Sequence, residues 1–486
     1  MNIKKVAALA LTLCLAVALL GGCQKSQDYG LDPNNPTNIT IWHYYNGVQL
    51  ENFDNMLLEF NETVGRERGI VIEGRSKGTI ADLADSVMAS LRQDVGADPA
   101  PDMFSAYAEA AYIADRMERV VDLSKYFTEN ELEEYVSGYL EEGNIDENGG
   151  LKIFPTAKST EVMLLNLTDW QKFADAVGVT VDDLATWEGL TQTAEKYYAY
   201  TDAQTPDVPN DGKAFFGRDS VANYMVVGAR QLGLEFVTIE NGIAVLNENK
   251  EAIRRLWECY YVPYVKGYYC AHARFRSDDA KTGAIIAMVC STTGGAYFPT
   301  SVTLNDEYTY PIGELALPVP NFEGTEPFVV QQGAGMVVVK SEEKKEYACS
   351  VFLKWFTEKE RSIAFSANSG YLPVKKEAND FDAIMASFET DGNSVNKALL
   401  DTMEVAVAEI NSYQLYAAKP FAKSTETRDF LDTFIHQTAL KTYDEAAARI
   451  ESGENRGDVL AEYVSDEAFE AWYAVFMTNL KAVSGI

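Results

Sequence analysis

The chain has 486 residues, a hydrophobic fraction of 47% and a formal net charge of −32. This apolar content excludes an intrinsically disordered protein, and the negative charge excludes nucleic acid and anionic lipid as partners because both would be repelled. The folded part, about 450 residues, is too long for one simple core, so we expect two lobes.

The N-terminal segment has the pattern of an export signal. Two lysines precede an apolar run, residues 6–20, which is shorter than the roughly 20 residues that a membrane-spanning helix needs. The run ends in Leu-Gly-Gly before Cys23, which resembles a bacterial lipoprotein signal. We therefore expect residues 1–22 to be a signal peptide, Cys23 to be lipidated, and residues 23–37 to form a flexible tether. An ordinary cleaved signal with an incidental cysteine is the alternative.

The first part of the folded chain alternates strand patterns with helical ones. Short apolar runs indicate strands, and apolar residues spaced three or four apart indicate helices. In chain order we expect a strand at 39–41, a helix at 50–60, a strand at 70–72, a helix at 80–91 and a strand beginning at 101–104. This order predicts a mainly parallel sheet with covering helices.

Rings and polar residues follow these three strands. Residues 42–45 are four rings in a row, and segments 77–80 and 105–109 follow the second and third strands. Ligands of such sheets bind at the carboxyl ends of the strands, so we expect the three segments to share one edge of one lobe.

The rest of the chain continues the α/β character and ends in helices. A second α/β block begins near Leu151, a glycine-containing strand is expected at 331–340, and the last hundred or so residues have mostly helical patterns. The sequence contains no internal repeat and no low-complexity segment.

Motifs for metal, cofactor or hydrolytic chemistry are missing from the sequence. It contains no HExxH, GxSxG, P-loop or CxxC motif, and the two Asp/Asn/Gly turns that resemble calcium loops lack the bidentate glutamate. We therefore expect no metal and no cofactor. Cys259 and Cys270 could close a short disulfide or remain free thiols, and both alternatives stay open.

Five segments together resemble the extracellular solute-binding proteins of carbohydrate ABC transporters, the maltose-binding-protein-like type. They begin with PDMFSAYAEAAYIAD and end with a long segment that closes in GYLPV, and they lie at 101–115, 149–166, 186–198, 283–298 and 331–374. Each is weak alone, but their order and spacing cover most of the chain after the signal.

The resemblance implies an α/β, two-lobed periplasmic-binding-protein-like (type II) fold with a hinge and an inter-lobe ligand cleft. Chain crossings between the lobes would lie at 152–161, just before Gln331, and at 371–374. The lobes would comprise residues 38–155 plus 331–372, and residues 156–330 plus 373–486. The two lobes would close about the hinge, and the closed form would be favoured only when solute is bound.

The resemblance also implies the function. The protein would be the solute receptor of an ABC importer, with no enzymatic activity and most simply a monomer, anchored by lipid to the outer face of the cytoplasmic membrane. It would bind a carbohydrate, first of all an oligosaccharide, and deliver it to a permease and its ATPase. Alternatives are a receptor for glycerol phosphate or another polyol derivative, a surface glycoside hydrolase, and a passive adhesive lipoprotein.

Rings suit a carbohydrate ligand, because they stack on the C–H faces of sugars and keep a polar edge. Along a strand, Trp42 and Tyr44 share one face, and His43 and Tyr45 share the other, so we expect one set to be core.

The remaining candidates follow strands, lie at expected crossings, or occupy glycine-containing loops near them. The full set of ligand-binding candidates is Trp42, Tyr44, Tyr45, Thr79, Tyr107, Glu109, Ser159, Glu161, Tyr224, Ser291, Thr292, Gly294, Gly333, Gly335 and Tyr371. Few cations accompany them, only Lys77 with Arg75 and Arg428, which argues against a phosphorylated ligand. Arg428 itself is more simply explained as a surface arginine.

Overall fold

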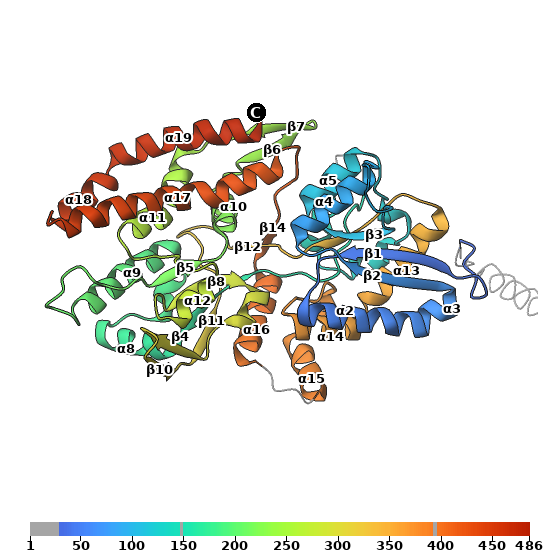
Figure 1. The fold of residues 1–486 in the computed structure, drawn as a ribbon, viewed down its shortest axis with the longest axis horizontal. Coiled ribbons are helices and arrows are strands. Elements are labelled where there is room, and N and C mark those ends of the chain that lie inside the picture. The colour runs from blue at the N-terminus through green and yellow to red at the C-terminus, as the bar shows by residue number, and fades with distance from the viewer. Residues whose placement is uncertain (1–28, 146–148, 392–395) are drawn as a thin grey trace, which may run out of the picture.

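The computed structural model describes residues 29–145, 149–391 and 396–486, which form two α/β lobes lying side by side (Figure 1). The expected signal peptide, residues 1–22, and the expected lipidation site, Cys23, lie outside the described residues. No helix in the described ranges is long and apolar enough to span a membrane.

The first lobe is built on a four-stranded sheet, as the strand and helix alternation predicts. Its order is β13-β3-β1-β2. β1 (Thr37–His43) runs parallel to β2 (Ile70–Ser76) and β3 (Met103–Ala106), whereas β13 (Gly335–Val338) is antiparallel to β3. Its helices are α2 (Gly47–Phe60), α3 (Arg66–Arg68), α4 (Ile80–Leu91), α5 (Ala108–Arg116), α6 (Glu129–Glu133), α7 (Ser137–Glu142), α13 (Glu343–Phe356) and α14 (Lys359–Ser369), with the π-helical segment η1 (Asn61–Gly65) and the 3-10 turn η2 (Leu123–Lys125).

Local sequence accounts for these elements. The apolar stripe of α2 is buried at Phe53, Leu57 and Phe60, as its helical spacing predicts. α4 begins at a reciprocal capping box, in which Thr79 and Asp82 each bond the other's backbone N–H. β1 is longer than expected and lies between two neighbouring strands. Helices, among them α4 and α13, pack against it and cover its faces.

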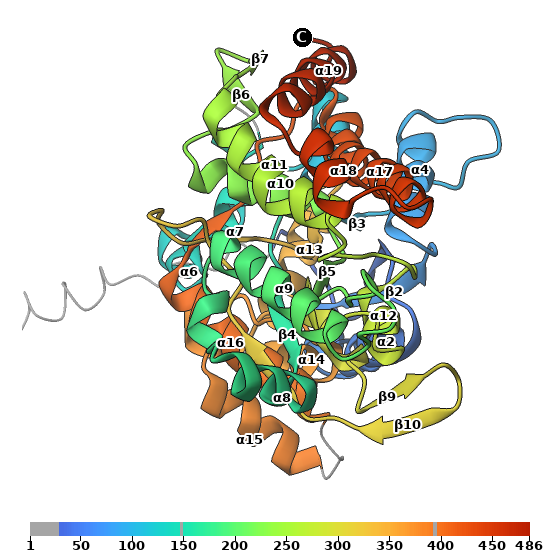
Figure 2. The same cartoon turned by 90° about the vertical axis from the view of Figure 1, so that its left-hand side faces the viewer.

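The second lobe has its own mixed sheet. The order is β11-β4-β8-β5, in which β4 (Glu161–Asn166) is antiparallel to β8 (Ala287–Ser291) and to β11 (Glu314–Leu317), and β5 (Phe216–Arg218) is parallel to β8. Two hairpins are added, β6 (Val237–Glu240) with β7 (Ile243–Leu246), and β9 (Ser301–Leu304) with β10 (Tyr308–Pro311). Figure 2 shows the β9–β10 hairpin projecting from this lobe.

Helices make up the rest of this lobe, and most of the C-terminal hundred residues are helical as expected. They are α8 (Leu167–Val177), α9 (Trp187–Asp202), α10 (Val221–Gln231), α11 (Lys250–Val265), α12 (Arg276–Lys281), α16 (Lys397–Ser412), α17 (Ser424–Glu451), α18 (Arg456–Tyr463) and α19 (Asp466–Ser484), with the 3-10 turns η3 (Val181–Leu184) and η4 (Thr292–Tyr297). α17 and α19 lie side by side (Figure 2).

Chain segments that join the lobes run side by side between them. Ser159 and Gln332 exchange backbone hydrogen bonds of 3.0 and 2.9 Å, and Lys158 pairs with Leu372. These pairings lie within the stretches where crossings are expected. The sequence missed one further segment, β14 (Gln414–Tyr416), which pairs in parallel with β12 (Phe328–Val330).

The exact lobe boundaries stay a prediction. After α14, the chain passes the 3-10 turn η5 (Lys376–Ala378) and forms α15 (Phe381–Asp391). α15, assigned to the second lobe from sequence, packs against α14 of the first lobe and also touches α16 (Figure 1).

Part of the expected tether packs on the first lobe. The Tyr29 ring lies 4.5 Å from that of Tyr347 and 5.5 Å from that of Tyr126. Leu31 is buried in the first lobe's core cluster. Residues 32–36 are exposed. The flexibility of the tether stays a prediction.

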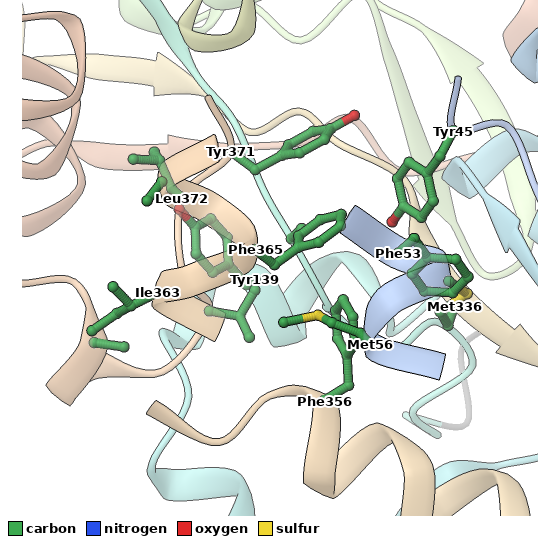
Figure 3. Packing of buried hydrophobic residues seen from close by; sticks show 14 of the residues in the cluster. Tyr45, Phe53, Met56, Tyr139, Met336, Phe356, Ile363, Phe365, Tyr371 and Leu372 are labelled. Atoms are coloured by element: carbon green, nitrogen blue, oxygen red, sulfur yellow. The ribbon is translucent and has the colours of Figure 1, made fainter. Parts of the chain in front are cut away.

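An aromatic cluster closes the base of the first lobe (Figure 3). The rings of Phe365 and Tyr371 are nearly parallel, at 6.2 Å and 7°, and Tyr45 stands edge-on to Phe365 at 5.5 Å. Phe53 completes the group at 5.0 Å from Tyr45. These contacts bind α2 and α14 to the end of β1.

Candidate ligand-binding cleft

A cavity of about 560 Å³ lies between the lobes, within the range typical of small-molecule sites. α4, β3 and α5 line it from the first lobe, and α10 and the start of α17 line it from the second. Its base is formed by residues 330–332 and 416–418, next to the joining segments. A second cavity of about 470 Å³ lies in the second lobe alone, and none of the candidate residues lines it.

The cleft combines an apolar wall with a small set of polar groups. The apolar part includes Ile80, Met88, Phe104, Ile113 and Val226. The polar side chains are the carboxylates Asp85, Glu109, Glu142 and Asp429, the guanidinium of Arg428, the amides Asn223, Gln331 and Gln332, and the hydroxyls Ser105, Tyr107, Tyr416 and Thr425. Such a surface offers rings for stacking and many hydrogen-bonding groups for a polar ligand.

Two of the predicted tyrosines, Tyr44 and Tyr371, share a hydrogen bond, and a third, Tyr107, lines the cleft. The hydroxyls of Tyr44 and Tyr371 are 2.8 Å apart, with Tyr44 half-buried and Tyr371 buried. Tyr107 keeps 36% of its surface exposed and faces the cleft. Burial raises the pKa of Tyr107, Glu142 raises it further and Arg428 opposes them, so the hydroxyl stays protonated at neutral pH. Tyr107 can therefore donate a hydrogen bond to a ligand while its ring stacks.

A buried ion pair ties the joining segments to the first lobe. The Lys158 ammonium bonds the Glu142 carboxylate at the end of α7 and donates to the Gly333 carbonyl at 2.6 Å. Gly333 has a φ of +88°, and a Cβ there would lie 2.8 Å from the Ala157 carbonyl oxygen. Glycine is therefore required for this close approach of two segments, and contact of Gly333 with a ligand stays a prediction.

Glu161, another candidate, is occupied by internal partners. Arg218 donates to one carboxylate oxygen at 2.7 Å, and the Asn223 amide donates to the other at 2.9 Å. All three side chains are buried. The amide oxygen of Asn223 in turn accepts from Arg428 at 2.7 Å, which links the base of β4 to the cleft.

Two candidates, Tyr107 and Glu109, line the cleft where the sequence placed them, at the start of α5. That they touch ligand stays a prediction. Tyr44 and Ser159 do not line the cleft; Tyr44 bonds Tyr371, and Ser159 pairs through its backbone with Gln332, which does line it.

Four of the candidate rings, Trp42, Tyr45, Tyr224 and Tyr371, are buried in the core, although for Trp42 and Tyr45 we expected only one of their two sets to be core. Trp42 is 1% exposed and belongs to a cluster with Leu83 and Val87, because β1 is a central strand with helices on both faces. Tyr45 is 1% exposed in the aromatic cluster. Tyr224 is buried in the second lobe, where its hydroxyl donates to the Leu256 carbonyl at 2.8 Å. The alternation of Trp42 and Tyr45 holds, but both faces are core.

Four further candidates have local structural roles. Thr79 caps α4, and Ser291 caps η4 by accepting from the Gly294 backbone at 3.2 Å. Thr292 is fully buried, η4 packs against α16, and a Cβ at Gly370, after α14, would come within 2.9 Å of the Thr293 backbone. A Cβ at Gly335 would come within 2.4 Å of Ile153, so this glycine serves packing beneath the sheet.

The sequence missed several lining residues. Gln331 and Gln332 directly precede the glycine-containing strand at an expected crossing, so their place was a usable signal. Tyr416 belongs to the unexpected joining segment, and Asp85 lies on the exposed side of α4. Arg428 was set aside as a surface residue, but it is half-buried at the cleft.

The cysteines described by the structure, Cys259, Cys270, Cys290 and Cys349, are free and buried. Burial raises the pKa of the Cys270 thiol to about 12, so it stays protonated at neutral pH. Of the two alternatives, the structure has free thiols and not the Cys259–Cys270 disulfide. Among the described residues no group of side chains could hold a metal ion.

Comparisons with known proteins place this geometry in a family. The family model for bacterial extracellular solute-binding proteins matches residues 55–393. A comparison with curated proteins gives no match.

Solved structures share the fold at low sequence identity. The cyclic alpha-maltosyl-1,6-maltose binding protein from Arthrobacter globiformis has a TM-score of 0.64 and 18% identity, over 92% of this chain and 100% of that one. UgpB from Mycobacterium tuberculosis, solved with glycerophosphocholine, has a TM-score of 0.62 and 17% identity, over 89% of this chain and 100% of that one. The GacH receptor of Streptomyces glaucescens, solved with acarbose, has a TM-score of 0.60 and 13% identity, over 89% of this chain and 99% of that one. With the family model covering most of the chain and the two-lobed fold agreeing, this protein belongs to the bacterial extracellular solute-binding proteins.

Proposed function

We propose that this protein is the carbohydrate receptor of an ABC importer and binds an oligosaccharide between its lobes. The observation that carries the proposal is the cavity of about 560 Å³ lined by both lobes, with the Tyr107 and Tyr416 rings among amides and carboxylates. Rings beside hydrogen-bonding side chains match the alternating apolar faces and hydroxyls of a sugar. Structures of similar fold include binders of cyclic maltosyl-maltose, acarbose and cycloalternan.

Closure would couple ligand binding to transport. The joining segments pair side by side at the base of the cleft, and the tyrosines and Lys158 surround them. Sugar bridging the two walls stabilises the closed form, because only that form makes both sets of contacts. A permease and its ATPase would recognise the closed, loaded receptor, which acts as a monomer and needs no catalysis of its own.

The lipoprotein leader is part of the same proposal. Lipid on Cys23 would hold the receptor on the outer face of the cytoplasmic membrane, beside its permease. Tyr29 and Leu31 pack on the first lobe, so only residues 24–28 would separate these contacts from the lipid.

A receptor for a phosphorylated polyol is the second candidate, since a glycerophosphocholine binder shares the fold. The cations that could serve it are engaged elsewhere. Lys77 pairs with Asp98 at 2.8 Å and Arg75 with Glu73 at 2.9 Å, and neither lines the cleft. A phosphate would have Arg428 alone among the lining residues.

The test is a ligand screen on residues 24–486. Thermal unfolding is followed with neutral oligosaccharides, amino sugars, phosphorylated polyols and peptides. A ligand at about 100 times its Kd adds about 2.7 kcal/mol to the free energy of unfolding, which raises the midpoint measurably. A rise in the unfolding midpoint with oligosaccharides, lost in Tyr107→Ala, would support the proposal. Hydrolysis of the bound sugar by the purified protein would contradict it, and so would a rise in the midpoint only with another class of ligand.

A further inference from the structure

We infer that Arg428 is the residue that sets ligand specificity in the cleft, that Asn223 positions it, and that it selects uncharged polyhydroxyl ligands. This inference rests on the proposed function and deepens it. It stands on a chain of buried polar contacts and on the charges that line the cleft.

The contacts begin deep in the second lobe and end at the cleft. Arg218 at the end of β5 bonds Glu161 at 2.7 Å, Glu161 bonds Asn223 on α10 at 2.9 Å, and Asn223 bonds Arg428 on α17 at 2.7 Å. Glu161 is the first residue of β4, directly after the joining segment. This relay, Arg218–Glu161–Asn223–Arg428, therefore anchors Arg428 to a buried ion pair at the start of β4.

Asn223 is suited to this place because an amide has two different ends. Its NH₂ group donates to the Glu161 carboxylate, and its oxygen accepts from the Arg428 guanidinium. Only one orientation of the amide satisfies both neighbours. The side chain is fully buried, so water cannot substitute for either bond. Arg428 is thereby fixed through one nitrogen, and its remaining donors are free to meet a ligand.

The charges around Arg428 oppose an anionic ligand. Arg428 is the only cationic side chain among the described residues that line the cleft, against four carboxylates. Glu142 is neutralised by Lys158, but Asp85, Glu109 and Asp429 make no ion pair with any described residue. A phosphorylated ligand would meet one guanidinium and three uncompensated carboxylates.

An uncharged polyhydroxyl ligand satisfies both kinds of group. Its hydroxyl oxygens accept hydrogen bonds from the guanidinium of Arg428, and its hydroxyl groups donate hydrogen bonds to carboxylates such as Glu109. A cationic group would pair with the carboxylates, but it has no lone pair with which to accept a hydrogen bond from Arg428. The mixture of one cation and several acceptors therefore matches a neutral saccharide best.

The first experiment uses calorimetry to measure the Kd values of three ligands. These are the neutral saccharide that binds most tightly in the screen, glycerol 3-phosphate, and glucosamine. Arg428→Gln is expected to weaken saccharide binding at least tenfold, and its ligand-free melting midpoint is measured beside it to separate lost binding from lost stability. Asn223→Ala should weaken it similarly, and the double variant no further, because Asn223 acts through Arg428. Arg274→Gln, an exposed arginine away from the cleft, is the matched control and should bind normally.

Further outcomes separate the ligand class from the positioning. Glu109→Gln should raise the affinity for glycerol 3-phosphate, since it removes a repelling charge. Unchanged saccharide affinity in Arg428→Gln, or tightest wild-type binding of glycerol 3-phosphate or glucosamine, would overturn the inference. If no saccharide binds, the proposed function fails and the ligand class fails with it.

The positioning role has a test that needs no ligand. Phenylglyoxal modifies accessible arginines, and peptide mass mapping gives the rate at Arg428. The rate should rise severalfold in Asn223→Ala relative to wild type, with Arg274 reacting equally in both. An unchanged rate at Arg428 would overturn the relay even if a saccharide binds.

Discussion

Replacing Lys158 with methionine is expected to destabilise the protein by about 3–5 kcal/mol, the usual cost of removing one partner of a buried ion pair. The Lys158 side chain is 0% exposed and that of Glu142 is 7% exposed. Methionine keeps most of the apolar stem, so little packing is lost. What remains is an unpaired carboxylate at the base of the cleft and a Gly333 carbonyl without its 2.6 Å donor, worth about 1 kcal/mol more.

The double variant Lys158→Met with Glu142→Leu should recover most of this loss. Apolar replacement of a whole buried pair is often neutral, because the desolvation of both charges disappears with them. Lys172→Met is the control, since Lys172 pairs with Asp169 at 2.9 Å but its side chain is 61% exposed. An exposed pair contributes about 0–1 kcal/mol.

Urea unfolding, followed by tryptophan fluorescence and by far-UV circular dichroism, measures these differences. The two signals should coincide if the unit unfolds in one step, and the midpoint should then move without a change in slope. A loss in Lys158→Met no larger than in Lys172→Met would refute the assignment of Lys158 as a buried, paired charge. So would a double variant as unstable as the single one.

Three further predictions follow from burial and from the leader. Trp42→Ala should cost about 3–5 kcal/mol of stability as a core truncation, whereas Tyr107→Ala should leave the melting midpoint near wild type and weaken ligand binding; the reverse pattern would return Trp42 to the cleft. Burial lowers the pKa of His43 from 6.5 to about 4, so the unfolded chain binds a proton that the folded one does not, and the free energy of unfolding should fall by roughly 3 kcal/mol as pH drops from 6.5 to 4. His43→Phe should lack this component, and equal pH profiles for both proteins would contradict it. Cys23→Ser should release the protein from the membrane fraction, and its continued retention in the membrane fraction would contradict the lipid anchor.

The sequence by itself was enough for the fold class and much of the chain's organisation. Strand and helix patterns along residues 39–104 are local, so periodicity alone predicts the parallel sheet and its covering helices. Tyr107 and Glu109 follow a strand of that sheet, and a strand's carboxyl end is where ligands gather. Their place at the cleft was therefore predictable without any long-range contact.

Only the tertiary structure decided which rings are core and which charged side chains line the cleft. Trp42 and Tyr45 alternate as predicted, but the burial of both faces depends on helices that pack against β1 from both sides, among them α4 and the distant α13, which no local pattern reveals. Asn223 and Arg428 lie 205 residues apart in the chain and meet because α10 packs on α17. A polar side chain has the same local signal whether it faces solvent or a cleft, so its role is set by the packing of distant elements.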